Sequence, residues 1–517
     1  MFLLHSTILI TALGALGAAT VDAPTPTIKK AYGTFLGTPA IEGVDSFLGI
    51  RYAQPPLDDL RFQPPQPLNE TKPYHTEPNG TIFANSFGPG CYQIHYTSLI
   101  MPQNLQGSMI PDEDCLFLNI WRPSNVTGDD AIPVMIWLYG GSFSEGDASV
   151  AVYNPEILVQ QNPSVMVVTF NYRLGIFGFP NSKARRGNLG LLDQRMAVEW
   201  VRDNIRAFGG DPDQMVLFGE SAGAVSISAY SYTYKDDPIV RGLIQQSGVA
   251  QGIGDADPLM WTLAAINVGC NNTDDPSKEL SCMMQLPAET IIKGISPSNV
   301  NPIGSANGGS PFVDNNTVFS AEGYIAKAER GDFAKIPVLL GSNDDEGNGV
   351  VNFSGEFGLN ESLADAITVS KFTCPVAMLA RQLHDNQVPV WRYRYMPVFP
   401  AVTFYPFSET YHLSEVPIIL GSFRKLVPYQ TPTKVELQAS QLMQKAWVSF
   451  AHDPRYGLSR WMEWPMYNPD EPTLITLFQD NKFQVKTTDQ NVYDRACTNP
   501  PSVSWEDVAA PPPGPTS

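Results

Sequence analysis

The sequence predicts an α/β fold in which helices cover both faces of a mostly parallel central sheet. Short apolar runs typical of buried strands alternate with segments in which apolar residues recur at helical spacing. The predicted strands are residues 134–139, 165–170, 215–218, 243–244 and 338–340. Because a strand–helix–strand order places successive strands parallel in one sheet, this alternation indicates a sheet between two layers of helices.

The predicted helices follow strands or are bounded by glycines. One is recognised from Leu192 onward and ends before Gly209-Gly210, a second begins at Ala222, and a late amphipathic helix begins at Val435. Residues 252–316 are richer in Gly, Asn, Asp and Ser. We expect this stretch to form large loop and helical insertions rather than sheet.

Composition limits the function classes. Of the 517 residues, 43% are hydrophobic, which is enough for a large core. Charged residues make up only 16%, which excludes extensive disorder of the high-charge kind. The net charge is −19, from 33 basic and 52 acidic residues. Such a chain is not expected to bind nucleic acid or an anionic membrane surface, and its acidity is better explained by solubility.

The two ends of the chain differ from its body. Residues 1–19 are predominantly apolar and end with small residues at Gly17 and Ala19, which predicts a secretory signal peptide cleaved near Ala19, although a basic start is missing. No later stretch has 18 uninterrupted apolar residues, so no integral membrane segment is expected. We expect one domain over residues 20–502 and a disordered, Pro-rich tail over residues 503–517.

Cysteines and glycosylation motifs agree with an extracellular protein. The even number of cysteines favours disulfides, with 15 pairings open on spacing alone; they are Cys91, Cys115, Cys270, Cys282, Cys374 and Cys497. None forms Cys-x-x-Cys, and no metal site is expected. The glycosylation motifs begin at Asn69, Asn79, Asn125, Asn271, Asn315, Asn352 and Asn360.

The strongest chemical motif is Gly219-Glu220-Ser221-Ala222-Gly223, between a predicted strand and a predicted helix. This context is typical of a nucleophile elbow, in which a sharp turn exposes a serine above the sheet edge. The flanking glycines let strand and helix approach closely. The alternative is a plain strand–helix turn in which the serine only caps the helix. Such a turn would not require glycines on both sides of the serine.

A nucleophilic serine also needs an oxyanion site. Gly140-Gly141-Ser142-Phe143 directly follows the strand at 134–139. Small residues there allow backbone N–H groups to point into a cavity. Together with the N–H of Ala222, they form the expected oxyanion site.

The base and the acid should follow the serine in the chain. His75 and His95 precede it, while His384 and His452 fall in or at the end of predicted helices. His412 is therefore the predicted base. The acid lies within Asp344-Asp345-Glu346, after the strand at 338–340, and position alone does not choose among these three carboxylates.

These motifs together resemble the type-B carboxylesterases, the cholinesterase and fungal lipase group with the α/β-hydrolase fold. The segment Phe208-Gly209-Gly210 and the serine motif resemble the family's nucleophile signature, and residues 113–121 resemble its second signature, with Phe117 where Tyr is commoner. The resemblance extends from Gly33-Thr34 to about Cys497, nearly the whole mature chain.

The resemblance implies roles that spacing leaves open. Glu346 matches the family's acid, His412 and Glu415 match its histidine loop, and Gly141, Ser142 and Ala222 match its oxyanion donors. Ser142 stands where the family usually has Gly, so the acyl site is expected to be narrower. The implied disulfides are Cys91–Cys115, Cys270–Cys282 and Cys374–Cys497. Arg173 and Asp193 resemble a structural ion pair.

The implied function is a secreted serine ester hydrolase that needs no cofactor and acts on short to medium acyl esters. The main alternative is an interfacial triacylglycerol lipase, whose lid would be the Cys91–Cys115 loop and whose partner would be a lipid interface. That loop lacks the Trp on which cholinesterase relatives hold a quaternary ammonium, which argues against choline esters. A catalytically inactive binding protein would have a broken triad, but all three residues are present. The sequence does not determine the oligomeric state.

Overall fold

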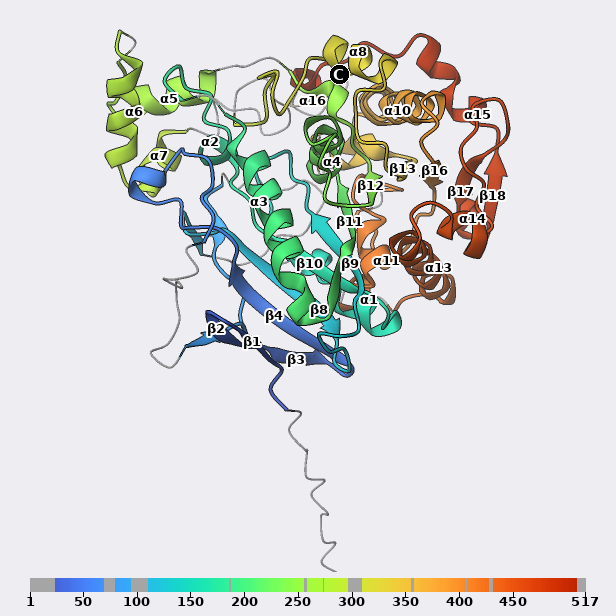
Figure 1. Ribbon diagram of the computed structural model, residues 1–517. Helices are drawn as coiled ribbons and strands as arrows, with labels where there is room; N and C mark the ends of the chain where they lie inside the picture. The colour runs from blue at the N-terminus through green and yellow to red at the C-terminus, as the bar shows by residue number, and fades with distance from the viewer. Residues whose placement is uncertain are drawn as a thin grey trace, which may run out of the picture.

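An eleven-stranded sheet forms the centre of the molecule (Figure 1). The computed structural model describes residues 24–68, 80–93, 110–185, 187–254, 258–272, 274–295, 309–354, 358–405, 407–426 and 431–508. The predicted signal peptide, His75, His95, Asn69 and Asn79 lie outside these residues.

The strand order in the sheet is β18-β17-β16-β13-β12-β11-β9-β10-β8-β4-β3. Six of its ten pairings are parallel, from β10 to β17, and antiparallel strands form both edges. The strands are β3 (Thr38–Ile41), β4 (Val44–Arg51), β8 (Phe117–Pro123), β9 (Ile132–Leu138), β10 (Met166–Phe170), β11 (Gly210–Glu220), β12 (Gly242–Gln246), β13 (Val338–Asn343), β16 (Val390–Tyr395), β17 (Leu474–Leu477) and β18 (Val485–Thr488). The sheet is thus mixed, and the five predicted strands are confirmed in its parallel part.

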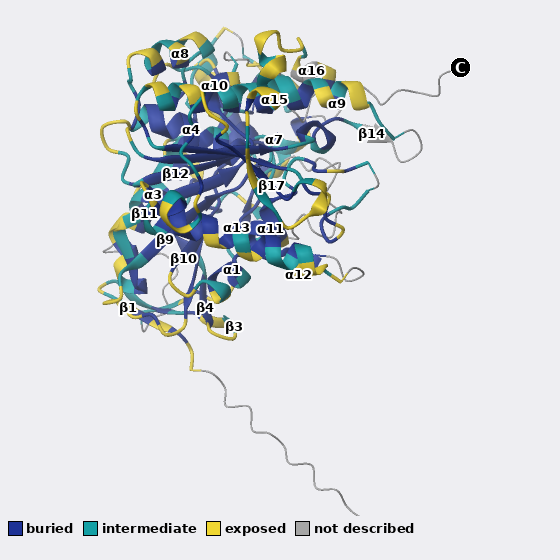
Figure 2. Ribbon diagram, turned by 90° about the vertical axis from the view of Figure 1, so that its right-hand side faces the viewer, coloured by how far each residue is buried: buried dark blue, intermediate teal, exposed yellow. Residues whose placement is uncertain are grey.

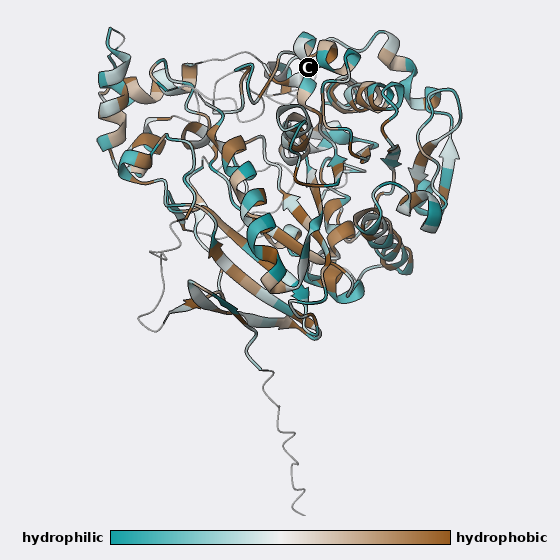
Figure 3. Ribbon diagram, viewed as in Figure 1, coloured by the Kyte–Doolittle hydropathy of each residue, from teal (hydrophilic) through white to brown (hydrophobic). Residues whose placement is uncertain are grey.

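Helices cover both faces of the sheet, as the sequence predicts (Figure 2). One side carries α4 (Ala222–Thr233), α8 (Ala321–Glu329) and α10 (Cys374–Asp385), and the other carries α1 (Glu156–Gln161), α11 (Val416–Leu420) and α13 (Lys434–His452). Helix α3 (Leu189–Asn204) also packs on β11. The strands are rich in hydrophobic residues (Figure 3), and β10 is buried along its whole length because helices shield both its faces.

The stretch expected to form loop and helical insertions rather than sheet contains three helices, in agreement with that expectation. These are α5 (Leu259–Asn267), α6 (Pro276–Gln285) and α7 (Ala288–Gly294). They share a hydrophobic cluster of their own, which includes the buried Trp261 and Met283. Asp275 caps α6 by accepting a hydrogen bond from the N–H of Lys278. The polar residues that favoured loops therefore act as helix caps and connections.

One helical stretch, Glu361–Asp385, is long and apolar enough by length and composition to cross a membrane. It contains α9 (Glu361–Ile367) and α10, and α10 packs against β13 and β16. Cys374 in this stretch is disulfide-bonded to Cys497. These contacts are those of a helix in the core of a globular domain.

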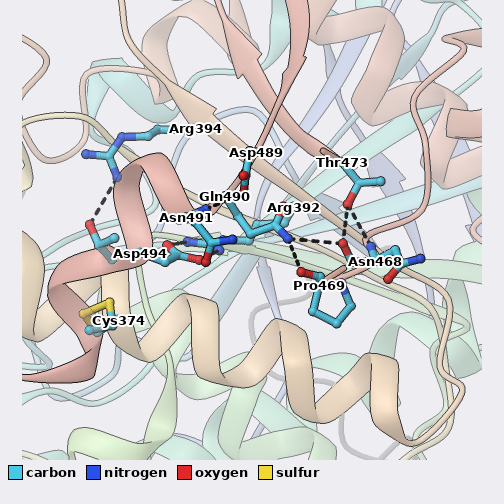
Figure 4. Close-up of polar contacts among 12 residues, drawn as sticks. Cys374, Arg392, Arg394, Asn468, Pro469, Thr473, Asp489, Gln490, Asn491 and Asp494 are labelled. Atoms are coloured by element: carbon cyan, nitrogen blue, oxygen red, sulfur yellow. Dashed lines mark hydrogen bonds and ion pairs between the residues drawn. A yellow bond between two sulfur atoms is a disulfide. The ribbon is translucent and has the colours of Figure 1, made fainter. Parts of the chain in front are cut away.

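The C-terminal segment is fastened to the sheet (Figure 4). Arg392 of β16 donates two hydrogen bonds, of 2.5 and 2.7 Å, to Asp494 of α15 (Asn491–Asp494). The disulfide Cys374–Cys497 adds a covalent link from α10. The short helix α16 (Trp505–Val508) follows, and its Val508 is fully buried. Residues 503–508 thus differ from the expected disorder, and residues 509–517 lie outside the described residues.

Candidate active site

Ser221 occupies a sharp turn between β11 and α4. Its backbone angles are φ 55° and ψ −123°, a conformation that non-glycine residues rarely adopt. A Cβ at Gly219 would lie 2.6 Å from the carbonyl oxygen of Leu138, and one at Gly223 only 2.0 Å from the same atom. Both glycines are therefore required by the close approach of β9. The predicted strand–turn–helix context is present.

The loop after β9 touches this turn. A Cβ at Gly140 would lie 2.7 Å from the Cβ of Ser221 and 2.8 Å from Oε2 of Glu220. Gly141, Ser142 and Phe143 follow with φ of 103°, 54° and 61°. Within the described chain, the N–H groups of Gly141 and Ser142 meet no acceptor.

Ala222 is the first residue of α4, where helix N–H groups have no intrahelical partner. The sequence-predicted oxyanion donors thus lie on the two segments that meet at Ser221. Three consecutive left-handed residues distinguish this loop from an ordinary strand-ending turn.

His412 contacts Glu346, not the two neighbouring carboxylates. Its Nδ1 lies 2.6 Å from Oε2 of Glu346, which is fully buried. The second oxygen of Glu346 accepts a 2.7 Å hydrogen bond from the N–H of Asn343. Asp344 instead pairs with Arg394, and Asp345 accepts from the N–H of Thr410.

A contact that sequence reasoning missed lies on the other side of the imidazole. Nε2 of His412 is 3.1 Å from Oε1 of Glu220, the residue before the serine. Neither His412 nor another described side chain forms a hydrogen bond with Oγ of Ser221. The imidazole therefore lies between two carboxylates, one of which adjoins the serine. The Glu within the serine motif was the available sequence signal.

Charge and burial shift the pKa values of this group. Burial alone would lower the pKa of His412, but Glu220, Glu346 and Glu415 raise it to about 9. Burial raises the pKa of Glu220 to about 8, against the opposing effect of His412. The two titrations are coupled, because a proton on Glu220 removes a charge that favours the imidazolium. Strongly shifted groups of this kind are typical of catalytic sites.

A buried hydrogen-bond network holds the acid loop. Glu415 accepts from Nδ2 of Asn343 at 2.6 Å and from Nε2 of Gln246 at 3.0 Å. Nε1 of Trp447 on α13 donates to Oε1 of Gln246 at 3.0 Å. Since Asn343 also donates to Glu346, the network ties the acid to β12, β13 and α13.

The other described histidines lie in different surroundings. Nδ1 of His384 is 3.0 Å from the carbonyl oxygen of Tyr467, and Nε2 of His452 is 2.9 Å from Oγ of Ser164. Neither contacts the residues around Ser221. Arg173 and Asp193 form a buried ion pair of 2.7 Å.

The cysteines form three disulfides in the described residues, Cys91–Cys115, Cys270–Cys282 and Cys374–Cys497. Of the glycosylation motifs, Asn125, Asn271 and Asn315 are exposed, and Asn352 and Asn360 are half-buried. No group of three or more His, Cys, Asp or Glu residues in the described ranges could hold a metal ion.

A mixed sheet with a serine turn after a central parallel strand, and acid and histidine loops after later strands, defines the α/β-hydrolase fold. Within that fold, the chain belongs to the carboxylesterase family: the sequence pattern described as "Carboxylesterase family" matches residues 24–362 and 356–497.

Three relatives agree with this assignment. A chlorogenic acid esterase of Aspergillus niger is 35% identical over 464 residues, 85% of this chain and 87% of the relative. Secreted lipase 5 of Gibberella zeae is 33% identical over 502 residues, covering 88% and 90%. A fumonisin B1 esterase of Sphingopyxis macrogoltabida is 30% identical over 479 residues, covering 80% of each. The protein is a carboxylic ester hydrolase that acts on small-molecule esters. The disulfides and the secreted relative indicate an extracellular protein.

Proposed function

We propose that the protein hydrolyses esters through a Ser221–His412–Glu346 triad and an acyl-enzyme intermediate. The observation that carries this proposal is the 2.6 Å contact of His412 with buried Glu346, with Nε2 directed toward the residue that precedes the strained Ser221. A base held at Nδ1 by a carboxylate keeps Nε2 available for the proton of the serine.

In the first half of the reaction, Ser221 attacks the ester carbonyl and His412 takes its proton. Nε2 exchanges its contact with Glu220 for the serine hydroxyl, while Glu346 stabilises the imidazolium. The N–H groups of Gly141, Ser142 and Ala222 bind the oxyanion; losing one such donor typically costs about 3–4 kcal/mol. The C–O bond to the alcohol then breaks, and His412 returns the proton to the leaving oxygen.

In the second half, His412 deprotonates a water molecule that attacks the acyl-enzyme. The oxyanion donors act again, and the collapse of the intermediate returns the proton to Ser221 and releases the acid. The chemistry requires only these side chains and water.

The substrates we propose are short to medium acyl esters. Ser142 adds a Cβ beside the acyl carbonyl, where the resembled family usually has Gly, and this narrows the acyl site. Cys91 and Cys115 are only 24 residues apart, and their disulfide limits how far the loop between them can open. The esterases among the relatives are consistent with this preference.

Interfacial lipase activity is the second candidate. One relative is a secreted lipase, and Ile110, near the end of the Cys91–Cys115 loop, is 84% exposed. The test is the rate against substrate concentration across the solubility limit of a long-chain ester. A sharp rise when the emulsion forms would overturn the esterase proposal in favour of a lipase.

We also propose that the chain is secreted after cleavage near Ala19, forms one catalytic domain over residues 20–502, and carries N-linked glycans. The exposed asparagines at 125, 271 and 315 are the first candidates. N-terminal sequencing of the secreted protein and peptide mapping before and after deglycosylation test these points.

The triad is tested by Ser221→Ala. We expect ester hydrolysis to fall by roughly 10⁴-fold or more, since removing the nucleophile leaves only binding and the oxyanion site. Secretion and thermal stability should be retained. Turnover above about a hundredth of wild type in purified protein would overturn the proposal.

A further inference from the structure

The loop that carries the candidate oxyanion donors is held in part by its own backbone. The carbonyl oxygen of Gly141 accepts hydrogen bonds of 3.0 Å from the N–H groups of Ser144 and Glu145. The N–H of Ser142 belongs to the same peptide, and the described residues contain no cis peptide bond. In a planar trans peptide the C=O and N–H bonds point in opposite directions. Because the Gly141 carbonyl is turned into the loop, the N–H of Ser142 is turned away from those two donors.

Gly146 closes this loop against its start. Its φ is 121°, and a Cβ there would lie 2.8 Å from the carbonyl oxygen of Gly140. Gly140 in turn adjoins Ser221, as described above. Closely packed backbone segments cannot shift independently. A displacement of Gly146 is therefore passed to Gly140, and through Glu145 to the hydrogen bond that holds the Gly141 carbonyl.

A side chain from outside the loop fixes Gly146. Oε1 of Gln93 accepts a 3.0 Å hydrogen bond from the N–H of Gly146, and Nε2 of Gln93 donates to the carbonyl oxygen of Gly146 at 3.1 Å. Nε2 also donates to the carbonyl oxygen of Cys91 at 3.1 Å. A backbone N–H can only donate and a C=O can only accept, so a single orientation of the amide satisfies these contacts. Among the described side chains, only Gln93 forms hydrogen bonds with Gly146.

Gln93 itself extends from a well-anchored segment. It follows β6 (Gly90–Cys91), which pairs with β7 (Pro111–Asp112). The disulfide to Cys115 joins this segment to the chain that enters β8, and both cysteines are buried. The amide of Gln93 thus connects Gly146 to the central sheet by a route that does not pass through the oxyanion loop.

We propose that Gln93 is a positioning residue for the oxyanion site: its amide holds Gly146 and thereby sets the direction of the N–H of Ser142. The proposal rests on the proposed function, because Ser142 serves as an oxyanion donor only if Ser221 is the nucleophile. Oxyanion donors act more strongly on the transition state than on the substrate carbonyl. Loss of the Gln93 amide should therefore lower kcat and leave KM nearly unchanged.

The test compares Gln93→Leu with the wild type on a soluble short-chain ester. An organophosphate that phosphorylates Ser221 titrates the active sites, so that kcat refers to folded enzyme only. We expect kcat to fall by about 10- to 100-fold, up to the loss typical of removing one donor, with KM within about three-fold of wild type.

A trifluoromethyl ketone gives a second readout, because its adduct with the serine carries an oxyanion. Its inhibition constant should rise by a factor similar to the fall in kcat, since both depend on the same donors. An unchanged kcat in Gln93→Leu would overturn the proposal. So would a fall in kcat without a change in the affinity for the ketone.

Gln490→Leu is the matched control for structural damage. Gln490 is buried, and its amide donates to the carbonyl oxygens of Asn468 and Pro469 (Figure 4). It follows β18 at the edge of the sheet, whereas Ser221 follows β11 in the middle. This variant should lose thermal stability but keep kcat within about three-fold of wild type, because only structural hydrogen bonds are lost. A loss of kcat like that of Gln93→Leu would overturn the proposal.

Gln93→Glu tests the same role if Gln93→Leu does not fold. The introduced carboxyl still accepts from the N–H of Gly146, but it donates to the two carbonyl oxygens only when protonated. Its kcat, divided by that of the wild type at the same pH, should rise as the pH falls. A ratio that does not depend on pH would overturn the role of Gln93. Ester hydrolysis by Ser221→Ala would overturn the proposed function itself, whereas an inactive Ser221→Ala with fully active Gln93 variants would overturn only the role of Gln93.

Discussion

Charged side chains are buried in two neighbourhoods of this protein, around Arg173 and around His412. Arg173 donates three hydrogen bonds of 2.7 to 3.0 Å to Asp193 and one of 2.8 Å to the carbonyl oxygen of Gln63. One cation thus meets one carboxylate with matching geometry. Such a fork-to-carboxylate arrangement holds segments together without a need to exchange protons.

The neighbourhood of His412 is built differently. Two buried carboxylates, Glu220 and Glu346, contact one imidazole, and the buried Glu415 adds its charge from farther away. This excess of negative charge raises the pKa of His412, whereas burial first and the neighbouring charges second raise the pKa of Glu220 and Glu415. A buried cluster with more carboxylates than cations costs folding stability, but its groups can take up and release protons. A buried pair of one cation and one carboxylate is stable and does not exchange protons. The comparison teaches that burial of charge alone does not distinguish the proposed catalytic site from a structural ion pair, whereas the imbalance of charge does.

The largest effect should come from Glu346→Gln. The amide N–H of glutamine would donate to Nδ1 and force the imidazole proton onto Nε2, so His412 could no longer accept the proton of Ser221. We expect kcat to fall by about 10³- to 10⁴-fold with little change in stability. Steady-state kinetics check this result. Asp345→Asn, one residue away, should stay within a few-fold of wild type, and an equal loss there would contradict the role of Glu346.

Asp193→Asn should have the opposite effect, a loss of folding stability rather than of kcat. It leaves the buried guanidinium of Arg173 without its counter-charge, and we expect the free energy of unfolding to fall by about 3–5 kcal/mol. Urea denaturation measures this change. The matched control is Glu199→Gln on the same helix, whose carboxylate is partly exposed and should cost less than about 1 kcal/mol. Similar losses in both variants would show that burial does not distinguish the two ion pairs.

Glu220→Gln tests the effect of the carboxylates around His412 through the pH dependence of kcat/KM. His412 must be neutral to act as a base, so its raised pKa places the rise of kcat/KM with pH on the alkaline side of the usual histidine range. Removing the charge of Glu220 lowers the pKa of His412. The rising limb should therefore move to lower pH by about one unit or more. An unchanged limb, or one moved to higher pH, would show that Glu220 does not act on His412.

The smallest effects should come from His384→Ala and His452→Ala. Each histidine has a single polar contact and lies apart from the carboxylates around Ser221. We expect kcat/KM to change less than about three-fold for either variant. A large loss of activity without unfolding would remove the distinction between His412 and the other described histidines.

Local features of the fold were predictable from the sequence because they depend on neighbours in the chain. The apolar runs of β9 to β13 and the glycines around Ser221 act within a few residues. Helices α5 to α7 were predicted only as loop or helical insertions without bounds, since caps such as Asp275 have the composition of loops. The choice of Glu346 over Asp344 and Asp345 needed the family resemblance, because all three lie on the same short loop.

By itself, the sequence determined the parallel part of the sheet, the serine turn and the order of the candidate serine, acid and histidine, since periodicity and spacing act along the chain. Only the tertiary structure decided which atoms meet. It placed Glu220 against Nε2 of His412 and Glu346 against Nδ1, although Glu220 ends β11 and His412 follows β16. The sheet causes this convergence, because parallel strands end at one edge and bring loops that are distant in sequence into a single buried site.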